Sequence, residues 1–170
     1  VEIIRLPRCL HAGNLDEHFR YADPADYDLA LAFLRRPGPK IFLTGHFGNF
    51  EAMSHALGLF GARGAVIARR LDNPFLDRFL HADQDAGPRG LYVNFFGRPA
   101  STFKSVALLC LEYHAPILVM GAARVADPMR YRLYLEEIID PGEHASGPDP
   151  IGAITRRYTE ALERLARRHP

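Results

Sequence analysis

The sequence predicts an α/β protein, with a mixed, mostly parallel central sheet flanked by helices in a single domain. Short apolar runs alternate along the 170 residues with segments whose apolar residues recur at helical spacing, and Pro and Gly separate the two kinds of segment. A hydrophobic fraction of 48% and a charged fraction of 24% are typical of a globular protein with a buried core. They exclude a disordered tail, a collagen-like repeat and a long coiled coil.

The first half of the chain is expected to alternate between helix and strand. Asp23-Pro24 is a helix start, and Pro37-Gly38-Pro39 ends that helix because proline cannot continue it. The expected elements are, in order, a helix over 25–35, a strand over 40–44, a turn over 45–48, a helix over 49–60, a strand over 65–68 and a helix from Asn73-Pro74 to residue 80.

The second half is expected to continue this alternation and to end in an amphipathic helix. Ile154, Tyr158, Leu162 and Leu165 recur on one side of that helix. The expected elements are a loop over 83–88, a strand over 91–96, a helix capped by Ser101 that ends near 113, two strands over 116–123 and 130–137 around an Asp127-Pro128 turn, a loop over 141–150 and a helix over 151–168.

Charge and cysteine content exclude several classes of function. The 21 Lys and Arg residues nearly balance the 20 Asp and Glu residues, which argues against a nucleic-acid-binding protein. Cys9 and Cys110 make neither a disulfide framework nor a four-ligand metal site, so we expect a reducing compartment and no metal. No apolar run reaches the roughly 18 residues that a membrane span requires. Arginine dominates the cations, as phosphate binding or a GC-rich genome would produce.

The strongest chemical pattern is TGHFGNFE at residues 44–51, the H-x4-E block, between an expected strand and an expected helix. On one helix His46 and Glu51 would point about 140° apart, so they meet only if His46 precedes the helix and Glu51 lies in its first turn. Gly45 and Gly48 permit this bend. The helix N-terminus disfavours a cationic His46 and favours an anionic Glu51. The pair is then a neutral imidazole base held by a carboxylate; the alternative is a helix-capping His beside a solvated Glu.

Two further polar segments are candidate sites for an anion or a metal. RRLDNP at 69–74 places two arginines at a strand end, where they either hold an anion or are exposed before an ordinary helix cap. DQDAGPR at 83–89 gathers carboxylates that either bind a metal or order the loop. We favour loop ordering because no histidine converges on this segment.

Two weaker patterns have structural interpretations. Ser101 and Thr102 are expected to cap a helix rather than to hold an anion. Cys110 and His114 share a helix face at i, i+4, which more often reflects core packing than a zinc site. The sequence has no G-x-S-x-G, Walker A or G-x-G-x-x-G motif, so these serine-hydrolase and nucleotide sites are not indicated.

Taken in order, four segments resemble one known family, the bacterial lipid A biosynthesis acyltransferases, within the lysophospholipid acyltransferase superfamily. They are GHFGNFE at 45–51, RRLDNPFLDR at 69–78, ADQDAGPRGLYVNFFGRPAST at 82–102 and ITRRYTEALERLARRHP at 154–170. The resemblance implies a glycerolipid acyltransferase-like fold. It also implies transfer of a fatty acyl chain from an acyl-carrier-protein or coenzyme A thioester to a hydroxyl of a lipid A precursor or related glycolipid.

The resemblance further implies roles for individual residues. His46 would be the general base and Glu51 its partner. The expected substrate-binding residues, for phosphates of the donor or acceptor and for the oxyanion of the reaction, are Gly45, Gly48, Asn49, Arg69, Asp72, Asn73, Asp83, Asp85 and Arg89, with Arg98 as a further candidate. No cofactor is expected besides the acyl thioester. Members act at the cytoplasmic face of the bacterial inner membrane, so we expect a peripheral position there, beside a lipid acceptor.

The sequence departs from the family pattern in three places. The N-terminal membrane anchor of the family is absent, and so is its aromatic and basic C-terminal ending. Between Leu80 and His81 the family has another helix and strand. We therefore expect residues 1–170 to be a single acyltransferase domain, truncated at both ends and lacking a segment near 80/81.

Two other functions fit the same residues. A thioesterase-like hydrolase would use the same His and Glu to activate water in place of a hydroxyl acceptor. A catalytically inert protein of the same fold would bind lipid or acyl carrier protein without turnover, and the segment missing near 80/81 would account for its inactivity. The sequence predicts neither acyl length, acceptor identity nor oligomeric state.

Overall fold

A computed structural model of the chain describes residues 8–45, 49–62, 64, 91–125 and 129–168. Its central sheet has the strand order β1-β6-β5-β2. The strands are β1 (Phe19–Tyr21), β2 (Ile41–Leu43), β5 (Ile117–Arg124) and β6 (Tyr131–Ile139). β1 pairs with β6 in parallel and β2 pairs with β5 in parallel, whereas β5 and β6 are antiparallel. This arrangement confirms the predicted α/β class with a mostly parallel sheet.

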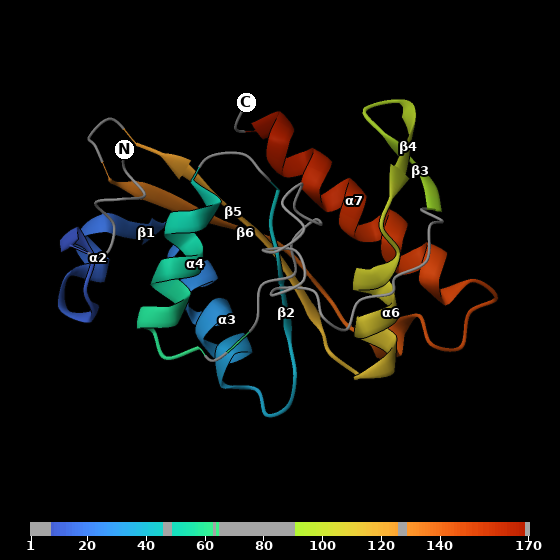
Figure 1. Ribbon diagram of the computed structural model, residues 1–170, viewed down its shortest axis with the longest axis horizontal. Helices are drawn as coiled ribbons and strands as arrows, with labels where there is room; N and C mark the ends of the chain where they lie inside the picture. The colour runs from blue at the N-terminus through green and yellow to red at the C-terminus, as the bar shows by residue number, and fades with distance from the viewer. Residues whose placement is uncertain (1–7, 46–48, 63, 65–90, 126–128, 169–170) are drawn as a thin grey trace, which may run out of the picture.

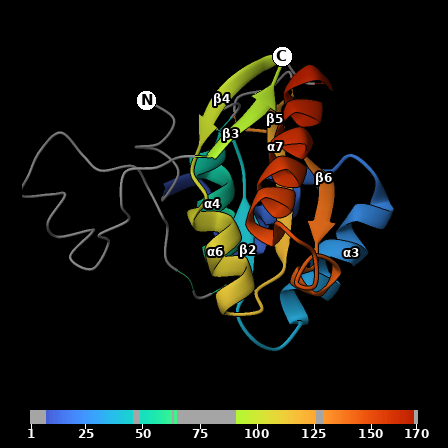
Figure 2. The same cartoon turned by 90° about the vertical axis from the view of Figure 1, so that its right-hand side faces the viewer.

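Helices cover both faces of this sheet (Figure 1). Their bounds are α2 (Leu15–His18), α3 (Pro24–Arg35), α4 (Phe50–Leu59), α6 (Ser105–Glu112) and α7 (Pro150–Arg168). The buried residues form two clusters, and successive residues of β5 alternate between them. Met120 packs with Phe33 and Met53 of the α2–α4 side, and Val119 packs with Cys110 and Ile154 of the α6–α7 side. We call these the α2–α4 face and the α7 face, and Figure 2 looks towards the α7 face.

The helix start predicted at Asp23-Pro24 is present. The Asp23 carboxylate accepts a hydrogen bond from the backbone N–H of Ala25 at 2.9 Å, and Pro24 is the first residue of α3. The expected helices over 25–35 and 49–60 correspond to α3 and α4, and the expected strand over 40–44 corresponds to β2. The strand expected over 65–68 and the helix expected from Asn73 lie outside the described residues.

The prediction that Ser101 caps a helix is wrong. Ser101 lies in strand β4 (Arg98–Thr102), opposite Tyr92 in the antiparallel strand β3 (Leu91–Phe95), and α6 starts only at Ser105. Phe96 and Gly97 form the two-residue turn with φ values of 53° and 76°, the left-handed conformation that suits the twist of a hairpin. The sequence did not indicate this hairpin, because Phe occupies the first turn position, where Asn or Asp is the usual signal.

The C-terminal half otherwise follows the expectation, and the N-terminus adds elements that were not predicted. The strands expected over 116–123 and 130–137 are β5 and β6, and the final amphipathic helix is α7. The loop expected over 141–150 begins with the short 3-10 helix η2 (Pro141–Glu143). The additional elements are the 3-10 helix η1 (Ala12–Asn14), α2 and β1. β1 joins the sheet beside β6, where Phe19 stacks on Tyr131 with ring centroids 5.3 Å apart.

A β-bulge in β6 directs two carboxylates to helix α7. Val119 pairs with Glu137 and Met120 pairs with Leu135, so Glu136 is an extra residue without a partner on β5. Because neighbouring residues of a regular strand point to opposite faces, Glu136 and Glu137 would otherwise diverge. With the bulge, both carboxylates bond to the guanidinium of Arg164, at 2.5 Å each.

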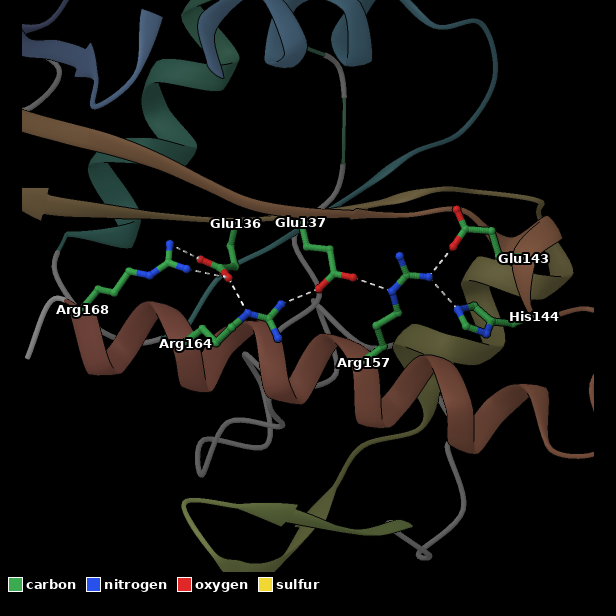
Figure 3. A network of polar contacts seen from close by, with 7 residues as sticks. All are labelled: Glu136, Glu137, Glu143, His144, Arg157, Arg164 and Arg168. Carbon is green, nitrogen blue, oxygen red and sulfur yellow. Dashed lines mark hydrogen bonds and ion pairs between the residues drawn. The ribbon is translucent and has the colours of Figure 1, made fainter. Parts of the chain in front are cut away.

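These carboxylates belong to a continuous chain of polar contacts between β6 and α7, the Arg–Glu ladder (Figure 3). In spatial order it consists of Arg168, Glu136, Arg164, Glu137, Arg157, Glu143 and His144. The Glu136 side chain is only 3% exposed and also contacts Arg168 at 2.8 Å. Charged groups removed from water interact more strongly than exposed ones, so the ladder holds α7 in one position along β6.

Candidate functional site

The H-x4-E block lies where β2 leads into α4, as the sequence predicted. β2 ends at Leu43, the half-buried Gly45 follows it, and Asn49 is the cap before α4. His46 and Gly48 lie outside the described residues. Because β2 and β5 are parallel neighbours, this block follows the carboxyl ends of parallel strands, where α/β proteins bind ligands.

Asn49 joins the start of α4 to the start of β6. Its Oδ1 accepts a hydrogen bond from the backbone N–H of Ala52 at 3.0 Å, as an N-cap does. Its Nδ2 donates to the hydroxyl oxygen of Tyr131 at 2.8 Å. Tyr131 is buried between this contact and the ring of Phe19. The first turn of α4 is therefore fixed relative to the edge of the sheet.

Glu51 occupies the position that the sequence assigned to it. It lies in the first turn of α4, and its side chain is exposed. The partial positive charge of the helix N-terminus stabilises a carboxylate at this position. The pairing of Glu51 with His46 stays a prediction, because His46 is not among the described residues.

A cavity of about 400 Å³ opens at the end of the sheet where the H-x4-E block lies. β6 and β1 begin at this end, where β5 finishes, since both are antiparallel to β5. The described residues that line the cavity are Glu17, His18, Arg20, Val125, Arg130, Tyr131 and Arg132. Tyr131 is thus both a wall of this cavity and the partner of Asn49. We call this cavity the arginine pocket.

A second cavity, of about 380 Å³, lies on the other side of Arg20. Its lining is mainly aromatic: Phe19, Tyr21, Tyr27 and Phe60 contribute, along with Asp16, Pro24 and Leu133. Burial, together with the nearby Tyr27 and Asp26, raises the pKa of Tyr21 to about 12, so its hydroxyl stays protonated at neutral pH. We call this cavity the aromatic groove.

The sequence did not predict either cavity. Their walls combine residues 16–27 with residues 125–133, and Phe60 adds to the aromatic groove; the first two segments meet because β1 pairs with β6. One signal was present in the second segment, where Arg130 and Arg132 alternate with the apolar Met129 and Tyr131. That alternation indicates a strand with one charged face, but it does not reveal what the charged face lies against.

Most of the other substrate-binding residues expected from the sequence lie in the part of the chain that the structure does not describe. These are Arg69, Asp72, Asn73, Asp83, Asp85 and Arg89. Arg98 is described, and it lies exposed beside the turn of the β3–β4 hairpin. The ligands for which the sequence proposed these residues therefore stay predictions.

Cys110 has the structural role that the sequence favoured. Its side chain is buried against Ile117 and Ile154 on the α7 face, whereas His114 is exposed beyond the end of α6. Burial, aided by the negative charge of Asp140, raises the pKa of the Cys110 thiol to about 11. Within the described ranges, no three His, Cys, Asp or Glu side chains gather as metal ligands. In the same ranges, no helix is both long and apolar enough to cross a membrane.

Comparison with known proteins assigns a family to this arrangement. The family model for the bacterial lipid A biosynthesis acyltransferases matches residues 78–170, which is more than half of the chain. The matched segment includes Asp83, Asp85 and Arg89 and all the elements from β3 to α7. The H-x4-E block precedes it. A comparison with curated proteins gives no match.

Proposed function

Because the chain belongs to the bacterial lipid A biosynthesis acyltransferase family, we propose that it is an O-acyltransferase that acts on a glycolipid. The acyl donor is a thioester of acyl carrier protein or of coenzyme A. The acceptor is a hydroxyl of a lipid A precursor or of a related glycolipid. The structural observation that supports this proposal is the position of Glu51, in the first turn of the helix that directly follows β2.

In the proposed reaction, His46 takes the proton of the acceptor hydroxyl while the hydroxyl oxygen attacks the thioester carbonyl carbon. Glu51 holds the imidazole ring and stabilises the imidazolium that forms. Backbone N–H groups between Gly45 and Gly48 stabilise the negative carbonyl oxygen of the tetrahedral intermediate. The carbon–sulfur bond then breaks, and the proton on His46 passes to the leaving thiolate. The protein forms no acyl-enzyme intermediate.

We assign the binding of the substrates to two polar segments of the sequence. Arg69, with Asp72 and Asn73, and Arg89, with Asp83 and Asp85, bind polar groups of the donor and the acceptor. We propose that the protein works at the cytoplasmic face of the inner membrane, where the acceptor lipid is accessible. Arginine suits this task because its planar guanidinium donates paired hydrogen bonds to phosphate.

The test is His46→Ala, assayed with a radiolabelled acyl thioester and a lipid A precursor. We expect acyl transfer to fall by about 100-fold or more, the usual contribution of a general base. His114→Asn is the matched control, because His114 is exposed and asparagine tolerates its left-handed backbone, with φ of 48°. Transfer by His46→Ala at a rate near that of the wild type would exclude the proposed base.

The same assay without a hydroxyl acceptor separates transfer from hydrolysis. An acyltransferase releases little free fatty acid under these conditions, whereas a thioesterase releases it at the full rate. Binding of the thioester donor with neither transfer nor hydrolysis would identify the protein as an inert lipid- or carrier-binding member of the fold.

A further inference from the structure

Three arginines gather on one face of the sheet at the arginine pocket. Arg20 in β1 and Arg132 in β6 are direct Cα partners in the parallel pairing of these strands. Arg130 precedes Arg132 by two residues and so points to the same face. All three side chains are exposed and line the same cavity.

Arg20 and Arg132 carry positive charges that no ion pair balances within the described ranges. Like charges opposite each other on paired strands destabilise a sheet. Within the described ranges neither Arg20 nor Arg132 forms an ion pair, and Arg20 Nε donates only to the carbonyl oxygen of Asp16, at 3.4 Å. Glu17 is the one carboxylate among the described lining residues. The direct pairing of Arg20 with Arg132 is therefore a repulsion that the described lining residues do not offset with an ion pair.

The wall of the pocket is built in advance of any ligand. His18 Nδ1 lies 2.8 Å from the carbonyl oxygen of Met129, which joins the end of α2 to the residues before β6. Met129 is buried and has a left-handed backbone, with φ of 62°. Tyr131 packs behind the arginines and is itself held by Asn49. These contacts position the strand that carries Arg130 and Arg132.

We propose that the arginine pocket binds a phosphate group carried by one of the two substrates. Phosphate offers several oxygens and up to two negative charges, which match converging guanidinium groups better than a single carboxylate does. A cavity of about 400 Å³ is large enough for a phosphorylated sugar or for the phosphate end of a phosphopantetheine arm. Tyr131 lines the pocket and bonds to the cap of α4, so the pocket and the H-x4-E block lie at the same end of the sheet.

The first test measures phosphate binding without any reaction. Inorganic phosphate and pyrophosphate are titrated at constant ionic strength, and thermal unfolding reports binding to the folded state. We expect wild type to be stabilised and the phosphate affinity of Arg20→Gln and Arg132→Gln to fall by about tenfold or more, as for the loss of a charged hydrogen bond. Arg35→Gln is the control, because Arg35 is equally exposed but lies at the far end of α3.

A second reading of the same experiment separates this site from ordinary surface charge. Without phosphate, Arg20→Gln and Arg132→Gln should unfold at a higher temperature than wild type at low salt, because the repulsion between the two strands is relieved. Arg35→Gln should not show this gain. If wild type gains no stability from phosphate or pyrophosphate, or if all three variants respond alike, the proposal is wrong.

The third arm, which rests on the proposed acyl transfer, identifies the substrate that carries the phosphate. Arg132→Gln should raise KM by about tenfold for the phosphorylated substrate alone, with a smaller change in kcat. A dephosphorylated acceptor would abolish the difference between variant and wild type if the acceptor is bound here, and would preserve it if the donor is bound. Phosphate binding by a wild-type protein that shows no transfer would refute the proposed function but would still support the phosphate site.

Discussion

The two faces of the central sheet are built in different ways. The α7 face is covered by a helix of 19 residues, whose buried side chains include Ile154, Tyr158 and Leu165 and whose arginines are tied to β6. The α2–α4 face is covered by three helices of 4, 12 and 10 residues. Both described cavities border on β1 and on α2, and the H-x4-E block leads into α4.

We therefore expect the α7 face to contribute mainly to stability and the region around the H-x4-E block to contribute mainly to catalysis. On the α7 face, the arginines and glutamates of the ladder form ion pairs with one another, so the ladder leaves little for a ligand to bind. At the end of the sheet where β2 leads into α4 and β6 begins, Arg20, Arg132 and the exposed Glu51 are available to a substrate. Substitutions in the ladder and the core of the α7 face should therefore affect mainly the free energy of unfolding, and those at this end of the sheet mainly turnover. Four measurements test this comparison.

The largest effect is expected for Glu51→Gln. Removing the carboxylate leaves the imidazole of His46 without its negative partner, so acyl transfer should fall by about 100-fold or more. The free energy of unfolding should change little, because the Glu51 side chain is exposed. Transfer assays and urea unfolding measure the two quantities. Glu112→Gln is the control, because Glu112 is an exposed glutamate on α6. Equal activity of the two variants would show that Glu51 has no special part in acyl transfer.

Glu136→Ala should lower the free energy of unfolding by roughly 2–3 kcal/mol, between the values for exposed and fully buried ion pairs. Its carboxylate is 3% exposed, and its loss leaves Arg164 and Arg168 without that partner. Arg156→Ala is the control, since its ion pair with Asp149 is about half exposed and should contribute less than about 1 kcal/mol. Urea unfolding that gives equal losses for both variants would show that the ladder does not hold α7.

Alkaline pH should destabilise the protein through Cys110. Its pKa is raised from 9.0 to about 11 in the folded state, so between these values the unfolded chain releases the proton first. The stabilising effect is complete below pH 9 and is lost as the pH rises to 11, by about 1.4 kcal/mol at pH 10. Urea unfolding at several pH values measures this slope. Cys110→Ala should flatten it, and an unchanged slope in that variant would assign the effect elsewhere.

The smallest of the four main effects is expected for Asn49→Ala. Loss of the cap on α4 should lower the free energy of unfolding by about 1 kcal/mol. Asn49→Asp retains the capping oxygen but not the amide that donates to Tyr131. We therefore expect Asn49→Asp to restore most of the stability while transfer remains reduced. If Asn49→Asp recovered full activity, the contact with Tyr131 would have no part in placing the block.

The sequence predicted the regular elements better than the site. Periodic apolar residues identified α4 and α7, and Asp23-Pro24 identified the start of α3, because these signals are local. The H-x4-E block was located by the same local logic. The arginine pocket was not, since His18 and Met129 are 111 residues apart and meet only in the folded sheet. The β3–β4 hairpin was missed because its left-handed turn is made by Phe96 and Gly97.

The shortness of β1 has a consequence for the order in which parts of the molecule open. Three residues of parallel pairing attach this edge strand to β6, and Arg20 is the middle one. If the strand detaches, one wall of the arginine pocket leaves with it, while the rest of the sheet stays folded. A bound anion would then stabilise the pairing of β1 with β6. In hydrogen exchange, its signature is slower exchange of the amides of residues 19–21 and no change within α7.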